Sequence, residues 1–280
     1  MFERVISARL IDEFKQYLYE EEKSIATIEK YLRDVRKFAS YAKGRVVDKK
    51  TVLAFKTDLG NRYSEVSANS MLAALNGFLK YAGWNDCCVK QFKIQQQPYC
   101  SEDKELTRSE YEHLVAAARS RGNERLAMMI QTICGTGIRV SELEFITIEA
   151  VDRGEVRVSC KGKQRVIFIV PKLRKKLKRY AEKRGMTHGP VFITRSGKPV
   201  SRCNIWREMK SLCKDTGISP EKVFPHNLRH LFARVFYSIE KDIAKLADIL
   251  GHSSIDTTRI YIITTGAEHR KRMEMMHLIL

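Results

Sequence analysis

Apolar residues recur every three or four positions through most of the first hundred residues, the spacing that gathers them on one face of an α-helix. Polar stretches separate four such segments. Ser24 is placed to cap the second helix, and the third and fourth follow Asp48 and Ser67. The expected core residues include Phe14 and Leu18, Ile28 and Leu32, Phe55 and Leu59, and Leu75 and Phe78. The pattern predicts a bundle of about four helices over residues 1–95.

The helical periodicity lapses between Lys93 and Leu106, where the sequence KIQQQPYCSEDKEL is polar and contains Pro98. We expect an interdomain linker over residues 96–106. Thr107 and Glu110 have the spacing of a capping box, which opens the first helix of a second domain over residues 107–280.

The second domain alternates helical and extended patterns. In GTGIRVSELEF two glycines interrupt the helical spacing, which places Arg139 at a junction between helices. Residues 155–159 and 165–170 read as strands, joined by a turn that holds Lys161 and Lys163, and residues 191–193 as a short further strand. Helices are expected to begin near Pro171, Ser201 and Pro225. The predicted fold is mainly α with a small antiparallel β-sheet.

Charge narrows the class of partner. The 280 residues contain 51 Lys plus Arg and 33 Asp plus Glu, a net charge of +18. Residues 151–185 alone hold 13 basic and 3 acidic side chains. Such a field favours a polyanion, with nucleic acid as the first candidate and an anionic membrane surface as the second. The candidate DNA contacts are Lys30, Arg33, Arg36 and Lys37 on one helical face, with Lys163 and Arg165 near the strand turn.

The cysteines and the N-terminus indicate location. The seven cysteines include no CxxC pair, so we expect reduced thiols. Charges interrupt every apolar stretch near the N-terminus, which predicts neither a signal peptide nor a spanning helix. These features favour a cytoplasmic protein with no membrane partner.

HNLRH, residues 226–230, puts His226 and Arg229 on one helical face and His230 one turn beyond His226. The histidine spacing also suits a metal ion, but a HExxH hydrolase would need glutamate at Asn227. We therefore expect neither a metal nor a cofactor.

LGHSSIDTTRIY places His252 and Tyr261 nine residues apart, just after Gly251. With Arg139, Arg229 and a turn lysine, these residues form a set rich in hydrogen-bond donors, with no carboxylate pair to hold Mg²⁺. Two guanidiniums suit the nonbridging oxygens of one phosphodiester. The tyrosine hydroxyl is the candidate attacker, and Lys161 is the candidate donor of a proton to the departing sugar oxygen. A phosphotyrosine link would conserve the energy of the broken bond, so the strand could be rejoined without ATP.

GTGIRVSEL, the turn KGK, HNLRH followed by LFA, and LGHSSIDTTRIY together resemble the active-site boxes of the tyrosine recombinase, or phage integrase, family. The resemblance spans nearly the whole chain and suggests a Xer-like, two-domain member. It implies a SAM-like, core-binding helical domain over residues 1–95 and a mixed α/β catalytic domain over residues 107–280.

The resemblance also implies residue roles. Arg139 and Arg229 would clamp the scissile phosphate, and Glu142 would be the supporting acidic residue. Lys161 would be the general acid, with Lys163 as the alternative because the turn is one residue shorter than in many relatives. His226 would handle a proton, and His252 would donate a hydrogen bond to the phosphate. Tyr261 would be the nucleophile that forms a 3′-phosphotyrosyl link.

The implied function is site-specific DNA recombination: integration, excision, inversion or dimer resolution. The implied partners are double-stranded DNA with paired inverted-repeat sites, further copies of the chain in a tetramer on two sites, and an accessory DNA-bending protein. The apolar C-terminal tail either docks on a neighbouring copy or covers its own core. Two alternatives stay open: strand nicking and rejoining of the type IB topoisomerase kind, and DNA-binding regulation without catalysis.

Overall fold

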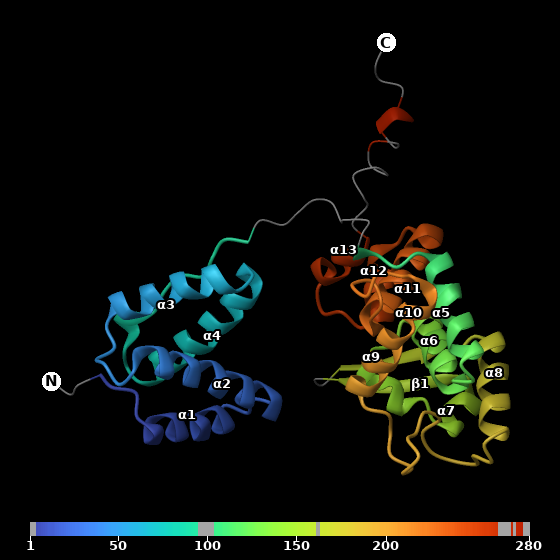
Figure 1. Ribbon diagram of the computed structural model, residues 1–280, viewed down its shortest axis with the longest axis horizontal. Helices are drawn as coiled ribbons and strands as arrows, with labels where there is room; N and C mark the ends of the chain where they lie inside the picture. The colour runs from blue at the N-terminus through green and yellow to red at the C-terminus, as the bar shows by residue number, and fades with distance from the viewer. Residues whose placement is uncertain (1–3, 95–103, 161–162, 263–269, 271–272, 277–280) are drawn as a thin grey trace. The chain divides into compact units, whose positions relative to one another are not determined.

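The computed structural model describes residues 4–94, 104–160, 163–262, 270 and 273–276. Contacts between Cα atoms divide the chain into two compact units, Met1–Gln96 and Gln97–Leu280 (Figure 1). Each unit has its own hydrophobic core. In the described part of the chain, no helix is long and apolar enough to cross a membrane.

The first unit is a bundle of four α-helices followed by a short 3₁₀ turn. Its elements are α1 (Ala8–Glu20), α2 (Ile25–Ala42), α3 (Lys49–Arg62), α4 (Glu65–Tyr81) and η1 (Asn85–Cys87). Phe14 and Phe78 meet edge to face in the core, with ring centroids 5.3 Å apart. Ser24 and Asp48 cap α2 and α3 as predicted. The predicted start of the fourth helix at Ser67 was wrong, because Ser64 accepts a hydrogen bond from the Ser67 N–H and caps the helix three residues earlier.

The second unit is built around α6, which is buried on nearly every side. Its elements are α5 (Arg108–Ser120), α6 (Glu124–Thr136), η3 (Val140–Phe145), α7 (Ile148–Arg153), β1 (Glu155–Cys160), β2 (Lys163–Phe168), α8 (Pro171–Glu182), α9 (Arg202–Ser211), α10 (Cys213–Thr216), α11 (Pro225–Glu240), α12 (Ile243–Leu250) and α13 (Ile255–Ile262). Helices α5, α8, α9 and α11 all contact α6. The predicted capping box of Thr107 and Glu110 is present, and Pro171 occupies the first turn of α8. Leu106, placed in the linker by the sequence pattern, is fully buried in this core.

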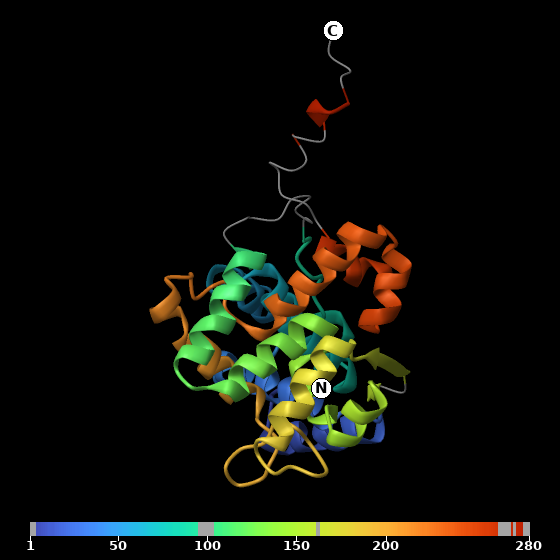
Figure 2. The ribbon, with the colours of Figure 1, turned by 90° about the vertical axis from the view of Figure 1, so that its right-hand side faces the viewer.

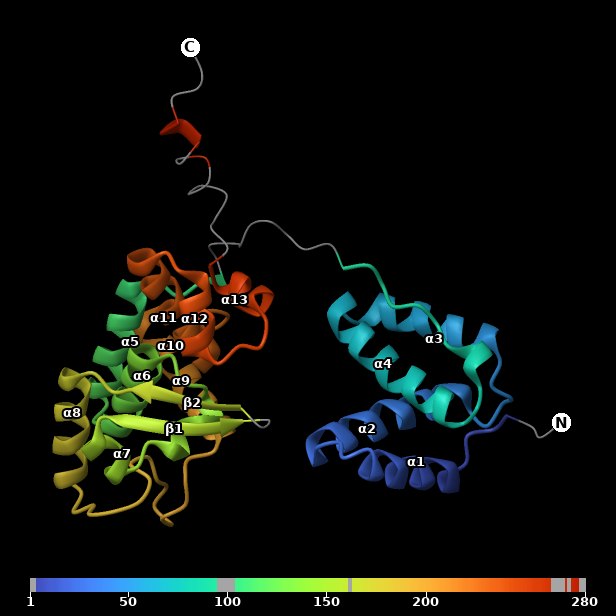
Figure 3. The same cartoon turned by 180° about the vertical axis from the view of Figure 1, so that it is seen from behind.

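β1 and β2 form an antiparallel hairpin in which Val158 lies opposite Arg165. Figure 3 shows the hairpin from behind, and β2 contacts α12. The strand predicted at residues 191–193 was wrong: the segment has one isolated bridge, Ile193 with Pro199, and a second, Thr147 with Pro190, lies just before it. Proline has no N–H to donate, so a ladder cannot extend through either position.

The last three helices gather at one end of the second unit (Figure 2). They share a small apolar cluster formed by Ala233, Leu246, Leu250 and Tyr261. This arrangement brings the end of α12 and the tyrosine of α13 against α11, the helix that carries the HNLRH sequence.

Candidate active site

The site is organised around the C-terminal end of α12. Gly251 ends this helix in the left-handed conformation (φ +65°), and the His252 N–H donates to the Ala247 carbonyl. The carbonyls of the last residues of a helix carry a partial negative charge and need donors from elsewhere.

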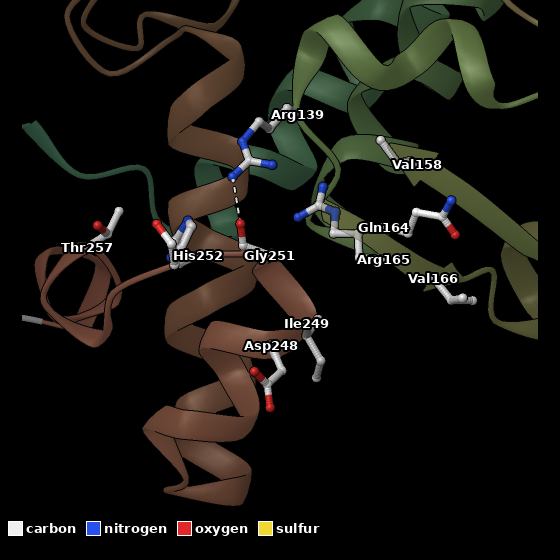
Figure 4. A pocket seen from close by; sticks show the side chains of 11 residues that line it. Arg139, Val158, Gln164, Arg165, Val166, Asp248, Ile249, Gly251, His252 and Thr257 are labelled. Atoms are coloured by element: carbon white, nitrogen blue, oxygen red, sulfur yellow. Dashed lines mark hydrogen bonds between the residues drawn. The ribbon is translucent and has the colours of Figure 1, made fainter. Parts of the chain in front are cut away.

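Three arginines supply those donors. Arg229 Nη2 donates to the Leu250 carbonyl over 2.7 Å, and Arg165 donates to the same oxygen. Arg139 donates to the Gly251 carbonyl over 3.3 Å, as the dashed line in Figure 4 marks. The helix end therefore collects three guanidiniums from three separate elements.

Arg229 is the most enclosed of these arginines, with 1% of the residue exposed. Besides Leu250 it donates to the carbonyl of Gly137, the residue that caps α6, and so joins the ends of two helices. Burial, followed by the nearby charges of Arg139 and Arg165, lowers its pKa to about 10. The guanidinium is still protonated at neutral pH, and the Tyr261 hydroxyl lies near enough to favour that charged form.

Glu142 lies between the other two arginines. Its carboxylate accepts from the backbone N–H and from Nη1 of Arg139, both over 2.9 Å, and pairs with Nη2 of Arg165. Only 5% of the Glu142 side chain is exposed. One buried carboxylate therefore orients two guanidiniums, and the group as a whole remains positive.

Tyr261 presents its hydroxyl to this cationic group from α13. The oxygen lies 3.3 Å from Nε2 of His226. Its ring stacks at a tilt on His230, with centroids 4.3 Å apart, and lies 5.2 Å from the ring of His252. The residue is 5% exposed, with apolar contacts to the cluster shared by α11, α12 and α13 and its hydroxyl facing His226.

The three histidines are neutral at pH 7. Burial, followed by the charges of Arg229 and Arg139, lowers the pKa of His226 and lowers that of His252 to about 4. Burial also lowers the pKa of His230 to about 4. A neutral imidazole retains one nitrogen that can accept a proton.

Both ring nitrogens of His252 have a hydrogen-bonding partner. Nε2 lies 3.1 Å from Nη2 of Arg229, and Nδ1 lies 2.8 Å from the hydroxyl of the buried Thr258. Because a guanidinium only donates, Nε2 accepts in this contact, and the proton stays on Nδ1 and is donated to Thr258. The threonine hydroxyl can donate as well as accept, so it could also serve the other tautomer.

A pocket of about 840 Å³ opens between the hairpin and the end of α12. Arg139, Arg165 and His252 line it, with Gln164 and Val166 on the strand side (Figure 4). The guanidiniums of Arg139 and Arg165 point toward the Gly251–His252 backbone. The arrangement suits an anion with several oxygens that can accept hydrogen bonds at once.

Residues 104–267 match the phage integrase family model, and residues 11–86 match the model of its N-terminal SAM-like domain. The chain belongs to the phage integrase family. The Tyrosine recombinase XerA proteins of Thermococcus kodakarensis and Pyrococcus furiosus are 31% and 30% identical to it. The first alignment covers 96% of both chains, and the second covers 100% of this chain and 98% of the relative. The predicted family and enzyme class are confirmed.

Solved structures agree with this assignment to the phage integrase family. A crystal structure of XerA recombinase is 25% identical, covers 97% of this chain and 99% of its own, and has a TM-score of 0.53. A lambda integrase (75–356) dimer bound to a COC′ core site is 18% identical, covers 94% and 96%, and has a TM-score of 0.77. The second likeness shows the fold alone, and it confirms the mainly helical, two-part architecture.

The structure of this phage integrase family member brings five of the six predicted catalytic residues into one site. These are Arg139, His226, Arg229, His252 and Tyr261. The sixth, Lys161, and the side chain of the alternative Lys163 lie outside the described residues. No group of three or more His, Cys, Asp or Glu within the described ranges is arranged to hold a metal ion.

The predicted DNA contacts divide into two sets. On α2, Arg33 and Arg36 are exposed, while Lys30 pairs with the buried Asp34 and Lys37 bonds to the Tyr63 hydroxyl. Arg165 differs from its prediction as a surface contact: its side chain is only 10% exposed and is held by Glu142 and Leu250. Register explains the difference, because Arg165 shares the inward face of the hairpin with Val158 and Ile167.

Sequence reasoning missed two residues of the site. His230 was considered only for metal spacing, although its position one turn from His226 could have placed it in the same group. Thr258 gave no sequence signal, because its bond to His252 depends on how α13 turns back onto α11.

Proposed function

We propose that this chain is a site-specific DNA recombinase that breaks and rejoins strands through a 3′-phosphotyrosyl intermediate. The observation that carries the proposal is the meeting, in one subunit, of the Tyr261 hydroxyl, an acceptor nitrogen of His226 and the buried guanidinium of Arg229. The names of the relatives, tyrosine recombinases, support it independently.

In the proposed reaction, Arg139 and Arg229 donate to the nonbridging oxygens of the scissile phosphodiester. Glu142 holds the first guanidinium, and the Gly137 and Leu250 carbonyls hold the second, so both are oriented to stabilise the charge that grows on phosphorus. His252 adds a third donor through the Nε2 tautomer that the Thr258 hydroxyl permits.

Tyr261 attacks the phosphorus, forming a bond from its oxygen to phosphorus as the bond to the 5′-oxygen breaks. The phenolic proton passes to Nε2 of the neutral His226, and Lys161 is the proposed donor of a proton to the departing 5′-oxygen. Attack by a 5′-hydroxyl from the same or another strand reverses these steps. One phosphodiester is exchanged for another, so no ATP is required.

We propose that residues 1–95 bind DNA and that residues 107–280 carry the chemistry, with residues 96–106 as the linker. Support comes from the net charge of +18, the exposed Arg33 and Arg36, and the match to the SAM-like model. Each phosphate that a basic side chain neutralises releases counterions, so binding will weaken steeply as salt rises. A cytoplasmic location is part of the same proposal.

We propose assembly as a tetramer on two DNA sites with paired inverted repeats, through an exchange of the C-terminal tails. Met273, Met275 and Met276 are exposed, which suits a segment that is covered by another copy. Truncation after Met273 is expected to leave binding to one duplex unchanged and to abolish pairing of two duplexes. An accessory DNA-bending protein is part of the same proposal, and recombination by the purified chain alone would show that none is required.

The central experiment selects bound duplexes from a random pool and introduces a nick into the best of them. Wild-type protein is expected to become covalently attached to this nicked duplex. Tyr261→Phe is expected to bind it with the same affinity and to form no adduct. Tyr237→Phe is the matched control, because Tyr237 packs against the same apolar cluster and should attach normally. Binding without attachment by the wild type would instead support a regulator.

A type IB topoisomerase-like activity makes a different prediction. Such an enzyme would relax supercoiled plasmid that lacks the selected site, whereas the proposed recombinase requires that site. Equal relaxation of plasmids with and without the site would contradict site-specific recombination.

A further inference from the structure

Arg165 stands apart from the other basic residues of the hairpin. The Arg157 side chain is 76% exposed and pairs with Glu155 on its own strand. The Arg165 side chain is 10% exposed, and both of its terminal nitrogens are engaged, Nη2 by Glu142 and Nη1 by the Leu250 carbonyl. A guanidinium can bridge two acceptors in this way because its donors are held in a rigid plane.

Both of these acceptors hold a phosphate-clamp arginine. Glu142 orients Arg139 by two hydrogen bonds of 2.9 Å, and the Leu250 oxygen also accepts from Arg229 over 2.7 Å. Arg165 therefore shares one hydrogen-bond acceptor with each of the two guanidiniums proposed to clamp the scissile phosphate.

The backbone around Arg165 is fitted to this position. A Cβ on Gly251 would lie 2.6 Å from Cδ and 3.0 Å from Nη1 of Arg165, so the side chain packs directly on the glycine backbone. Across the hairpin, Arg165 on β2 lies opposite the buried Val158 on β1. The residue thereby joins the hairpin, η3 and the end of α12.

We propose that Arg165 is a positioning residue that sets the spacing of the two phosphate-binding arginines, Arg139 through Glu142 and Arg229 through the Leu250 carbonyl. This inference rests on the proposed function. The proposal requires no contact between Arg165 and the phosphate, because Arg165 acts through Glu142 and through the Leu250 carbonyl. Loss of the bridge frees Glu142 to rotate with Arg139 and removes one of the two donors at Leu250, which misaligns donors that must act on the same phosphate.

The test compares Arg165→Met with Arg157→Met on the nicked duplex selected above. Both variants remove one positive charge from the same hairpin. Arg165→Met is expected to slow covalent attachment by about 10- to 100-fold, the effect of a small misplacement of reacting groups. Its affinity for the duplex and the fraction of protein that finally attaches should match the wild type. Arg157→Met is expected to attach at the wild-type rate.

Two further variants separate positioning from simple stabilisation. Arg165→Lys is expected to recover only part of the rate, because one ammonium cannot reproduce the planar bridge to Glu142 and Leu250. Arg165→Met combined with Glu142→Gln is expected to be little slower than the slower single variant, since both changes break the same link.

The inference is overturned if Arg165→Met attaches as fast as Arg157→Met, or if it lowers only the fraction of protein that attaches and not the rate. It is also overturned if the rate defect of the double variant equals the product of the Arg165→Met and Glu142→Gln defects. Absence of attachment by the wild type would overturn the proposed function and this inference together. Attachment by the wild type with equal rates for the two arginine variants would overturn this inference alone.

Discussion

The phenolic oxygen of Tyr261 lies 3.3 Å from Nε2 of His226, although the residues are 35 positions apart and lie on different helices, α13 and α11. The tyrosine hydroxyl thus lies beside a nitrogen of the same chain that can accept its proton. Because burial lowers the pKa of His226, that acceptor stays unprotonated at pH values where a free histidine is charged.

The first prediction concerns this pair. At low duplex concentration, the wild-type attachment rate should decline in acid with a midpoint below that of a free histidine, because burial lowers the pKa of His226. His226→Gln should slow attachment by about 10²- to 10⁴-fold and flatten the profile. Single-turnover rates from pH 5 to 8.5 make the comparison, with His113→Gln as an exposed control on α5. If the attachment rate of His226→Gln declined at acidic pH as the wild-type rate does, His226 would be excluded as the base.

Arg229→Lys is the second prediction. A lysine donates from a single nitrogen, which cannot span the Gly137 and Leu250 carbonyls and a phosphate oxygen as the separate nitrogens of the planar guanidinium can. Attachment should fall by about 10²- to 10³-fold, and the free energy of unfolding should fall by about 1–3 kcal/mol as buried carbonyls lose a donor. Arg259→Lys, at a 69% exposed side chain on α13, is the control for urea unfolding and attachment. Equal effects of the two changes would contradict the clamp.

The third prediction is that acid destabilises the fold through its buried histidines. In the unfolded chain a histidine gains its proton near pH 6.5, whereas folded His230 and His252 resist protonation until about pH 4. The unfolded state binds more protons in this window, so the free energy of unfolding falls as pH drops from about 6.5 toward 4. Urea unfolding of His230→Phe between pH 7 and 4.5 should show a shallower decline. The exposed His113→Gln should retain the wild-type slope, and equal slopes for all three proteins would refute this account.

Gly251→Ala gives the fourth prediction. Gly251 and Gly217 both adopt positive φ, +65° and +66°, so alanine at either strains the backbone by about 1 kcal/mol. Only at Gly251 would the new Cβ collide with a side chain, 2.6 Å from Cδ of Arg165, while nothing lies within 4 Å at Gly217. Gly251→Ala should therefore lose more unfolding free energy than Gly217→Ala and should alone slow attachment. Equal thermal shifts and equal attachment rates would show that the close approach has no consequence.

The sequence by itself determined the helices, most of their starts and the order of the chemical motifs. Capping by Ser24 and by Thr107 with Glu110, and the pairing of His226 with Arg229 on one face, depend on residues within about one turn of each other. Such relationships are set by the local backbone and can be read directly from spacing. The position of Gly251 at a helix end belongs to the same class.

Only the tertiary structure decided which distant groups meet. A basic residue on a predicted strand suggests an exposed contact, yet packing of the hairpin on α12 turns Arg165 toward Glu142, 23 residues away. Thr258 and His230 join the site because α13 folds back on α11. These contacts follow from how the apolar faces of separate helices pack, and spacing along the chain does not encode that packing.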